Sequence, residues 1–260
     1  MFTVSYSFNS RSFNLTSTTP SQPIMHSLLL LSATLGLASA AAASTDCVPR
    51  NSASFGFRLV INVTDPSKDL SPSINGLFLN LAHIGPAQNR AIATSTPGPI
   101  FYQNGTSNAP SFTNLLTDGG TPPFPEGLSY QQEQTDAQGA GIYVSAGSGA
   151  QAVKLTRLSV PYSYLTILAE VTASSFIGCN STIPYYGNGT EFQVINWVTT
   201  TRNATGTHLV IPEGCVPINL VPQCAVLEGL PADARSSHEF AQEVRCYDDV
   251  KGIEWGRFGY

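Results

Sequence analysis

The chain has 260 residues, of which 11% are charged, and its formal net charge is −5. Lysine occurs only three times, and the arginines are scattered singly along the chain. Because nucleic-acid binding needs clustered cationic side chains to neutralise phosphates, this composition argues against a nucleic-acid partner. The hydrophobic content of 42% can support a sizeable core, and the length suits one large β domain or two small ones.

Residues 1–24 form a polar extension that contains one arginine and no acidic residue. Because a secretory signal normally begins a chain, we expect translation to start at Met25, in which case the extension is not made.

Residues 25–43 have the layout of a secretory signal peptide. Met25 and His26 form a short polar start, an apolar run follows over residues 28–37, and small residues occupy positions 38–43. The run is shorter than the roughly 20 apolar residues that span a bilayer. The alternative is a buried helix rich in leucine and alanine. We predict a signal peptide at 25–43, a single secreted domain over 44–260 and no stable membrane anchor.

Two further features agree with a secreted, extracellular protein. The predicted mature part contains five N-glycosylation triplets, and all five cysteines follow the predicted cleavage site. The glycosylation sites predicted from these triplets are Asn62, Asn104, Asn180, Asn188 and Asn203.

The odd number of cysteines allows at most two bridges within the chain. Cys215 and Cys224 enclose a short segment with two prolines, and we predict a bridge between them. Cys179 and Cys246 are then the next expected pair, with Cys47 left free or recruited in place of one of the others. A zinc site is disfavoured because no CxxC pair is present and the histidines are isolated.

Strand patterns begin at residues 55–63, where alternate residues from Phe55 to Val63 are apolar and Arg58 and Asn62 fall on the opposite face. This alternation predicts a half-buried strand with Asn62 on its solvent side. Further strands are predicted at residues 77–83, 91–94, 100–103, 142–145, 153–160, 164–172, 191–200 and 207–211. Residues 104–140 are predicted to form a long surface excursion with one strand near 112–116.

Residues 191–200 carry apolar side chains on both faces, which predicts a central strand packed on both sides. Phe192, Val194 and Val198 share one face of this strand, and Ile195 and Trp197 share the other.

A helix is predicted near the C-terminus. Ser236 and Glu239 have the spacing of a capping box, and Phe240, Val244 and Tyr247 follow at helical intervals. Together with about ten short strands, this pattern predicts a mainly β protein. The expected fold is an antiparallel β-sandwich or a related barrel with one C-terminal helix.

A search for catalytic patterns finds no GxSxG, HExxH, phosphate-binding loop or EF-hand. We therefore predict no catalytic residue, no metal ligand and no cofactor. Of the carboxylates, Glu170 and Glu191 are the best candidates for glycoside hydrolysis, although glutamates on strands usually face solvent. His83 and His208 are expected to be structural, since no third ligand accompanies them.

Adjacent aromatic residues at Tyr185 and Tyr186 are the best candidates for stacking on a sugar, although two tyrosines on a turn beside a glycosylation triplet favour a packing role over sugar binding. The function predicted is that of a secreted, non-enzymatic glycoprotein that binds an extracellular glycan or protein surface. The alternative function is a polysaccharide hydrolase with a β-sandwich fold.

Residues 55–94, FGFRLVINVTDPSKDLSPSINGLFLNLAHIGPAQNRAIAT, resemble the opening of a family of small secreted proteins from filamentous fungi. The resemblance rests on two strands separated by a polar loop, the second ending in His83, followed by Gly85 and Asn89 before another short strand. It implies an uncharacterised β-rich domain without assigned catalytic residues, so no functional residue is transferred from the family.

Overall fold

The computed structural model describes residues 48–105, 113–131, 138–151, 153–156, 162–167, 174–187, 189–203 and 206–258. Within these ranges, the side chains of residues 200–203 and 206–208 are not described. The polar extension and the signal peptide predicted over residues 1–43 lie outside the described part, as do Cys47, Glu170 and Asn188.

Strands dominate the described residues, and the helical turns there are three short 3-10 turns. The strands are β1 (Ser52–Ser54), β2 (Gly56–Val63), β3 (Phe78–Gly85), β4 (Gln88–Thr94), β5 (Phe101–Asn104), β6 (Asn114–Gly119), β7 (Phe124–Gln131), β8 (Ala140–Ala146), β9 (Val153–Leu155), β10 (Leu165–Ile167), β11 (Ser174–Thr182), β12 (Glu191–Asn203), β13 (Gly206–Leu209), β14 (Cys215–Ala225), β15 (Ala241–Gln242) and β16 (Val244–Cys246). The turns are η1 (Pro66–Lys68), η3 (Pro184–Tyr186) and η4 (Trp255–Phe258).

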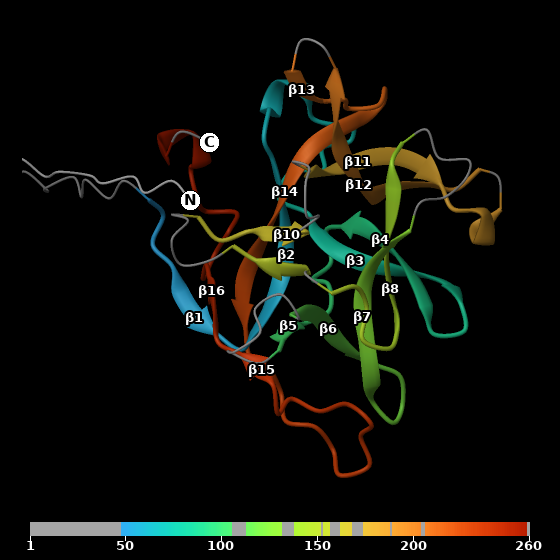
Figure 1. Ribbon diagram of the computed structural model, residues 1–260, viewed down its shortest axis with the longest axis vertical. Helices are drawn as coiled ribbons and strands as arrows, with labels where there is room; N and C mark the ends of the chain where they lie inside the picture. The colour runs from blue at the N-terminus through green and yellow to red at the C-terminus, as the bar shows by residue number, and fades with distance from the viewer. Residues whose placement is uncertain are drawn as a thin grey trace, which may run out of the picture. The chain divides into compact units, whose positions relative to one another are not determined.

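The main sheet closes into an antiparallel barrel to which further strands are attached. Its order runs from β13 through β12, β11, β14, β2, β3, β4, β8, β7 and β6 to β5 and β15, and extra pairings join β12 to β4 and β8, and β2 to β5. Figure 1 shows β2 and β14 crossing the centre of the domain and β4, β8 and β7 beside one another. Of the two predicted architectures, the structure is the barrel.

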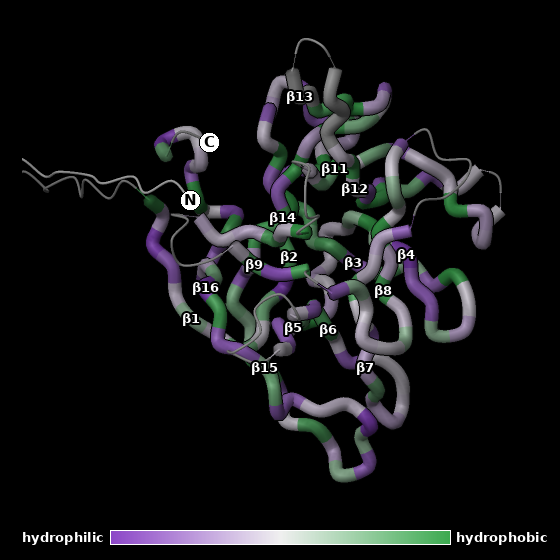
Figure 2. Tube along the Cα trace, viewed as in Figure 1, coloured by the Kyte–Doolittle hydropathy of each residue, from purple (hydrophilic) through white to green (hydrophobic). Residues whose placement is uncertain are grey.

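The main core fills the inside of the barrel. Alternate residues of β2 from Phe57 to Val63 belong to it, as the sequence predicts. The opposite face of β2 is also buried, because Val60 packs there against Tyr247 and Val250 of the C-terminal segment. The prediction of a half-buried strand is therefore wrong, and Asn62 is only 6% exposed. Figure 2 shows hydrophobic residues along β2 and β14 in the interior.

Strand β12 is central, as predicted. Ile195 and Trp197 point into the main core, whereas Val194 and Val198 pack in a second cluster on the other face. That second cluster also contains Ile177 and Cys179 of β11 and Ile92 of β4.

Residues 104–140 carry more strand than predicted. In place of one strand, this region contains β6 and β7, which pair from Leu116↔Gly127 to Gly119↔Phe124. The stretch with three prolines that suggested a loop is the turn of this hairpin and the first residues of β7. Two long strands, β11 and β14, were also not predicted, because their prolines and glycines interrupt the expected strand pattern.

The predicted C-terminal helix is wrong. Residues 236–247 contain the short strands β15 and β16, and Val244 to Cys246 pair with β1. The segment before β15 is held against the barrel by His238, whose Nε2 atom lies 2.8 Å from Asp118 Oδ2. Phe240, which the predicted helix would have packed against the sheet, is 49% exposed. Strand pairing and side-chain burial therefore override the local helical pattern.

The four cysteines predicted to pair do form two disulfides, but with different partners. Cys179 is joined to Cys215, and Cys224 is joined to Cys246. The predicted bridge between Cys215 and Cys224 is impossible because these residues lie at opposite ends of β14. Nine strand steps of about 3.3 Å separate them by roughly 30 Å. The two disulfides instead attach one end of β14 to β11 and the other end to β16.

A buried arginine joins three strands at the point where the sheet divides. Strand β4 pairs with β8 up to Arg90↔Tyr143 and then meets β12 at Ile92↔Val194. The Arg90 Nη1 atom donates hydrogen bonds of 2.7 Å to the carbonyl oxygens of Ile142 on β8 and Ile195 on β12.

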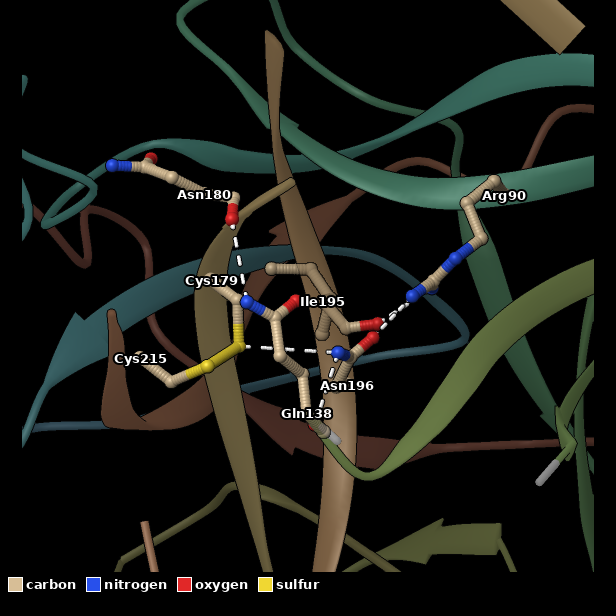
Figure 3. The surroundings of a disulfide bond; sticks show 7 residues. All are labelled: Arg90, Gln138, Cys179, Asn180, Ile195, Asn196 and Cys215. Carbon is tan, nitrogen blue, oxygen red and sulfur yellow. Dashed lines mark hydrogen bonds between the residues drawn. A yellow bond between two sulfur atoms is a disulfide. The ribbon is translucent and has the colours of Figure 1, made fainter. Parts of the chain in front are cut away.

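The second guanidinium nitrogen of Arg90, Nη2, donates to the side-chain oxygen of Asn196. The Nδ2 atom of Asn196 donates in turn to the carbonyl oxygen of Gln138 at 3.1 Å and lies 3.8 Å from Cys179 Sγ (Figure 3). Gly141 leaves room for the guanidinium, since a Cβ atom at this position would lie 3.1 Å from Arg90 Cζ.

We predict that Arg90→Met strongly destabilises the barrel. The substitution leaves two buried carbonyl groups and an amide oxygen without their donor, and each such loss costs about 1–3 kcal/mol. The free energy of unfolding in urea should fall by about 3 kcal/mol or more. Arg257→Met, at an exposed arginine in η4, is the control and should change it by less than about 0.5 kcal/mol. Equal effects of the two substitutions would contradict the role of Arg90.

We also predict that each disulfide can be detected and removed separately. Peptide mapping without reduction should recover Cys179 linked to Cys215 and Cys224 linked to Cys246, and a peptide joining Cys215 to Cys224 would contradict the structure. Replacing both cysteines of either pair by alanine should lower the free energy of unfolding by about 3–4 kcal/mol, since the closed loops span 36 and 22 residues.

Candidate functional site

Four aromatic side chains form a continuous row on the surface beside the second cluster, and we call them the aromatic row: His83, Tyr185, Tyr186 and Phe192. Consecutive ring centroids are 5.6 Å apart for His83 and Tyr185, 5.4 Å for Tyr185 and Tyr186, and 5.0 Å for Tyr186 and Phe192. The two tyrosines are 58% and 42% exposed. Large aromatic side chains at this exposure are available to stack on a ligand.

The sequence around η3 fixes the two tyrosines in place. Pro184 occupies the start of the turn directly after β11, and its carbonyl oxygen accepts a hydrogen bond from the amide of Gly187. Gly187 has a φ of 78°, a conformation that favours glycine and that turns the chain toward β12. Phe192 near the start of β12 packs against the second cluster. The row is thus attached to the barrel at one end and exposed in its middle.

A buried carboxylate lies on the barrel wall near the His83 end of the aromatic row. Glu126 is two residues before Leu128, whose side chain is in the main core, so strand alternation points both toward the inside. The Asn89 Nδ2 atom lies 3.3 Å from Glu126 Oε2 and donates a hydrogen bond to it. Asn89 is the register partner of His83 in the β3–β4 hairpin.

The environment of Glu126 disfavours its charged form. The residue is only 7% exposed. Burial raises the pKa of its carboxyl, and the hydrogen bond from Asn89 and the charge of His83 offset this effect only in part. Gly119 on β6 lies directly beside the carboxylate, since a Cβ atom there would be 2.4 Å from Glu126 Cδ. Titratable groups with perturbed pKa values are enriched at functional sites, which makes Glu126 a candidate.

The residues singled out in the sequence occupy different places. Tyr185 and Tyr186 are exposed as a stacking surface requires, and His83 joins them. Glu191 is exposed at the first position of β12, Glu170 lies outside the described residues, and the side chain of His208 is not described. Within the described ranges, no three His, Cys, Asp or Glu side chains lie close enough to hold a metal ion.

Glu126 and Asn89 were not identified from the sequence. Glu126 fell in the region expected to be a loop, although the alternation of Glu126, Leu128 and Tyr130 is a strand signal that would have placed it on the inner face. Asn89 is brought to the carboxylate by the β4–β8 and β7–β8 pairings, in which Asn89 and Leu128 are both register partners of Val144. No local pattern indicates that contact.

The predicted glycosylation sites differ in exposure. Asn180 on β11 is exposed, Asn104 on β5 is half-buried, and Asn62 is buried in β2. Asn188 lies outside the described residues, and the side chain of Asn203 is not described. Among the described residues, no helix has the length and apolar character needed to cross a membrane.

Comparison with known proteins places this chain in a family. A family model described as "Domain of unknown function (DUF7907)" matches residues 54–224. The chain is also 39% identical over 214 residues to the "Antigenic protein SchS34" of Stachybotrys chartarum, an alignment that covers 81% of this chain and 94% of that protein. No solved structure matches the chain. The predicted resemblance to an uncharacterised β-rich family of filamentous fungi is confirmed, and the chain belongs to the DUF7907 family.

Proposed function

We propose that this protein is a secreted, N-glycosylated, non-enzymatic protein that binds extracellular glycans through the aromatic row. The observation that carries the proposal is the exposure of Tyr185 and Tyr186 within a row of contacting rings. Aromatic faces attract the C–H groups of a pyranose ring, and the flat ring surfaces need little ordering on binding because their side chains already contact one another.

The geometry of the row suits an extended ligand better than a single sugar. Its ring centroids are 5.0–5.6 Å apart and successive ring planes are inclined by 88°, 73° and 51°, so an extended ligand would contact ring edges and faces in turn along the row. The exposed imidazole of His83 supplies a polar group at one end of the row. Stacking surfaces combined with a few polar groups are typical of specific small-molecule recognition.

Export is supported by the covalent structure and by the family. Two disulfides form among the described cysteines, and such bonds persist in oxidising compartments. The relative from Stachybotrys chartarum is named an antigenic protein, which fits a protein encountered outside the cell. The exposed triplet at Asn180 adds an accessible glycosylation site. Of the two carboxylates considered for the hydrolase alternative, Glu191 is exposed at the start of β12 and Glu170 lies outside the described residues.

Glycan binding predicts a specific pattern of substitutions. On a glycan array the protein should bind at least one class of oligosaccharide, and Tyr186→Ala should weaken that binding by about tenfold, because one stacked ring contributes about 1–1.5 kcal/mol. Tyr185→Ala should have a similar effect. Isothermal titration calorimetry with the best array ligand provides the affinities.

The matched control is Phe240→Ala, which removes an aromatic ring of similar exposure far along the chain from the row. This variant should bind like the wild type. An array with no ligand, or equal losses for Phe240→Ala and Tyr186→Ala, would refute glycan binding at the row.

Secretion and glycosylation are tested in a eukaryotic expression host. The protein should appear in the medium with an N-terminus near Ser44, and glycopeptide mass spectrometry should find Asn180 occupied. Asn62 should be unoccupied in the folded protein, because its side chain is buried against a paired strand and a glycan there would prevent that pairing. Retention in the cells, or a folded fraction with a glycan at Asn62, would contradict this prediction.

A further inference from the structure

One of the predicted glycosylation triplets lies in the chain segment between two rings of the aromatic row. The ring of Tyr186 contacts the ring of Phe192, with 5.0 Å between their centroids. The segment that joins these two residues therefore starts and ends at the same pair of rings. Asn188, the acceptor of the triplet Asn188-Gly189-Thr190, belongs to this segment and lies outside the described residues. A glycan attached there is tethered beside the row.

The tether between the glycan and the row is short. Asn188 follows Tyr186 by two positions. Consecutive Cα atoms are about 3.8 Å apart, so the Cα atoms of these two residues lie within about 7.6 Å of each other in any conformation of the chain. The first sugar of an N-linked glycan is bonded directly to the asparagine side chain. Its pyranose ring is therefore within reach of the Tyr186 ring.

The residues on either side of the acceptor leave room for a sugar. A Cβ atom built at Gly187 or at Gly189 would meet no described atom within 4 Å. Tyr185 and Tyr186 are 58% and 42% exposed, so both rings present surface that a sugar can cover. The turn η3 holds both tyrosines in place, and little further ordering of the rings is needed when a sugar stacks on them.

The exposed triplet at Asn180 provides a contrast. Ser181 is the register partner of Phe192, so its side chain lies on the same face of the sheet as that ring. Because side chains alternate along a strand, Asn180 points to the opposite face. A glycan at Asn180 therefore starts on the other side of the sheet, and the glycan at Asn188 is the one tethered to the row.

We propose that the glycan attached to Asn188 occupies the aromatic row, with its first N-acetylglucosamine stacked on Tyr186. This inference rests on the glycosylation and sugar binding proposed above, and it identifies the resident ligand of the row as the protein's own glycan. In the attachment step, the Asn188 amide nitrogen displaces the diphosphate of a lipid-linked oligosaccharide from its anomeric carbon, and an amide proton is released. External glycans compete with the attached glycan, so the row binds them more tightly when Asn188 is unglycosylated.

The first test measures stability in a cycle of four sequences. Protein secreted from a eukaryotic host is compared with Thr190→Ala, which removes the triplet and keeps Asn188, each with and without Tyr186→Ala. Loss of the glycan should lower the midpoint of thermal unfolding by about 2–4 °C when Tyr186 is present and by less than about 1 °C in its absence, because stacking on this ring supplies the stabilisation. The same four sequences made in a host without N-glycosylation give the effect of Thr190→Ala itself, which is subtracted.

Two controls separate stacking from general effects of glycosylation. Phe240→Ala, at an exposed ring far along the chain, should leave the stabilisation by the Asn188 glycan unchanged. Thr182→Ala removes the glycan at Asn180, and the resulting shift of the midpoint should be the same with and without Tyr186.

Nuclear magnetic resonance observes the contact directly. After the glycan is trimmed to one N-acetylglucosamine, nuclear Overhauser contacts should join the Tyr186 ring protons to this sugar, and the ring current should shift the sugar protons upfield. Both signals should be lost in Tyr186→Ala.

The outcomes separate this inference from the binding of external glycans. We expect Thr190→Ala to bind the best array glycan at least threefold more tightly than the glycosylated wild type. Equal affinities would show that the attached glycan leaves the row uncovered, and would refute the inference while external binding stands. An unoccupied Asn188 in the secreted protein, or a stabilisation independent of Tyr186, would also refute it. If neither form binds any array glycan but the Overhauser contacts are present, external binding fails and the inference stands.

Discussion

The fork in the sheet at Arg90 is the constraint on which the closed barrel depends. Strand β4 pairs with β8 on one side of this point and touches β12 on the other, so the ladder cannot supply partners to every backbone group at the junction. Buried carbonyl groups without a donor would make the closure unfavourable. The guanidinium replaces the missing donors for Ile142 and Ile195 with one rigid side chain. Arginine suits this position because its planar fork presents several donors in fixed directions.

The same junction lies on two of the strands that carry the candidate site. Arg90 fixes the middle of β4, and its neighbour Asn89 points to the other face of the strand, where it reaches Glu126. Asn196, whose side-chain oxygen accepts a hydrogen bond from Arg90, lies on β12, the strand that also carries Phe192. The hydrogen-bond network of Arg90 and Asn196 (Figure 3) therefore joins the two strands that carry Asn89 and Phe192 of the candidate site.

Local patterns in the sequence predicted the features that depend on local forces. The alternation in β2 and the two apolar faces of β12 were predicted because each strand carries its own pattern of burial. The C-terminal helix was predicted wrongly for a physical reason. Phe240, Val244 and Tyr247 have helical spacing, but Val244 is held in a strand by β1, and Tyr247 follows a cysteine bonded to β14. Strand β1 is nearly 200 residues before Val244, and Cys224 is 22 residues before Cys246, so a local sequence pattern contains neither partner.

The candidate site could likewise be predicted from the sequence only in part. Tyr185 and Tyr186 could be predicted as surface aromatics because proline and glycine flank them in the sequence. Glu126 could not be paired with Asn89 in advance, since that contact depends on the register of three strands. The disulfide partners were beyond reach for a similar reason, because Cys215 and Cys224 are close in sequence but lie at opposite ends of an extended strand.

The folded unit extends beyond the part that the family model matches. Residues 54–224 include the aromatic row, Glu126, Asn89 and Arg90, but end at Cys224. The outer face of β2 is nevertheless covered by Tyr247 and Val250, which lie after the match. The disulfide from Cys224 to Cys246 holds this covering segment in place. Without the segment, Val60 and Val221 would face water, and an apolar surface of that kind favours aggregation. The site therefore belongs to the matched barrel, whereas the burial of Val60 and Val221 depends on a C-terminal segment that the Cys224–Cys246 disulfide cross-links to β14.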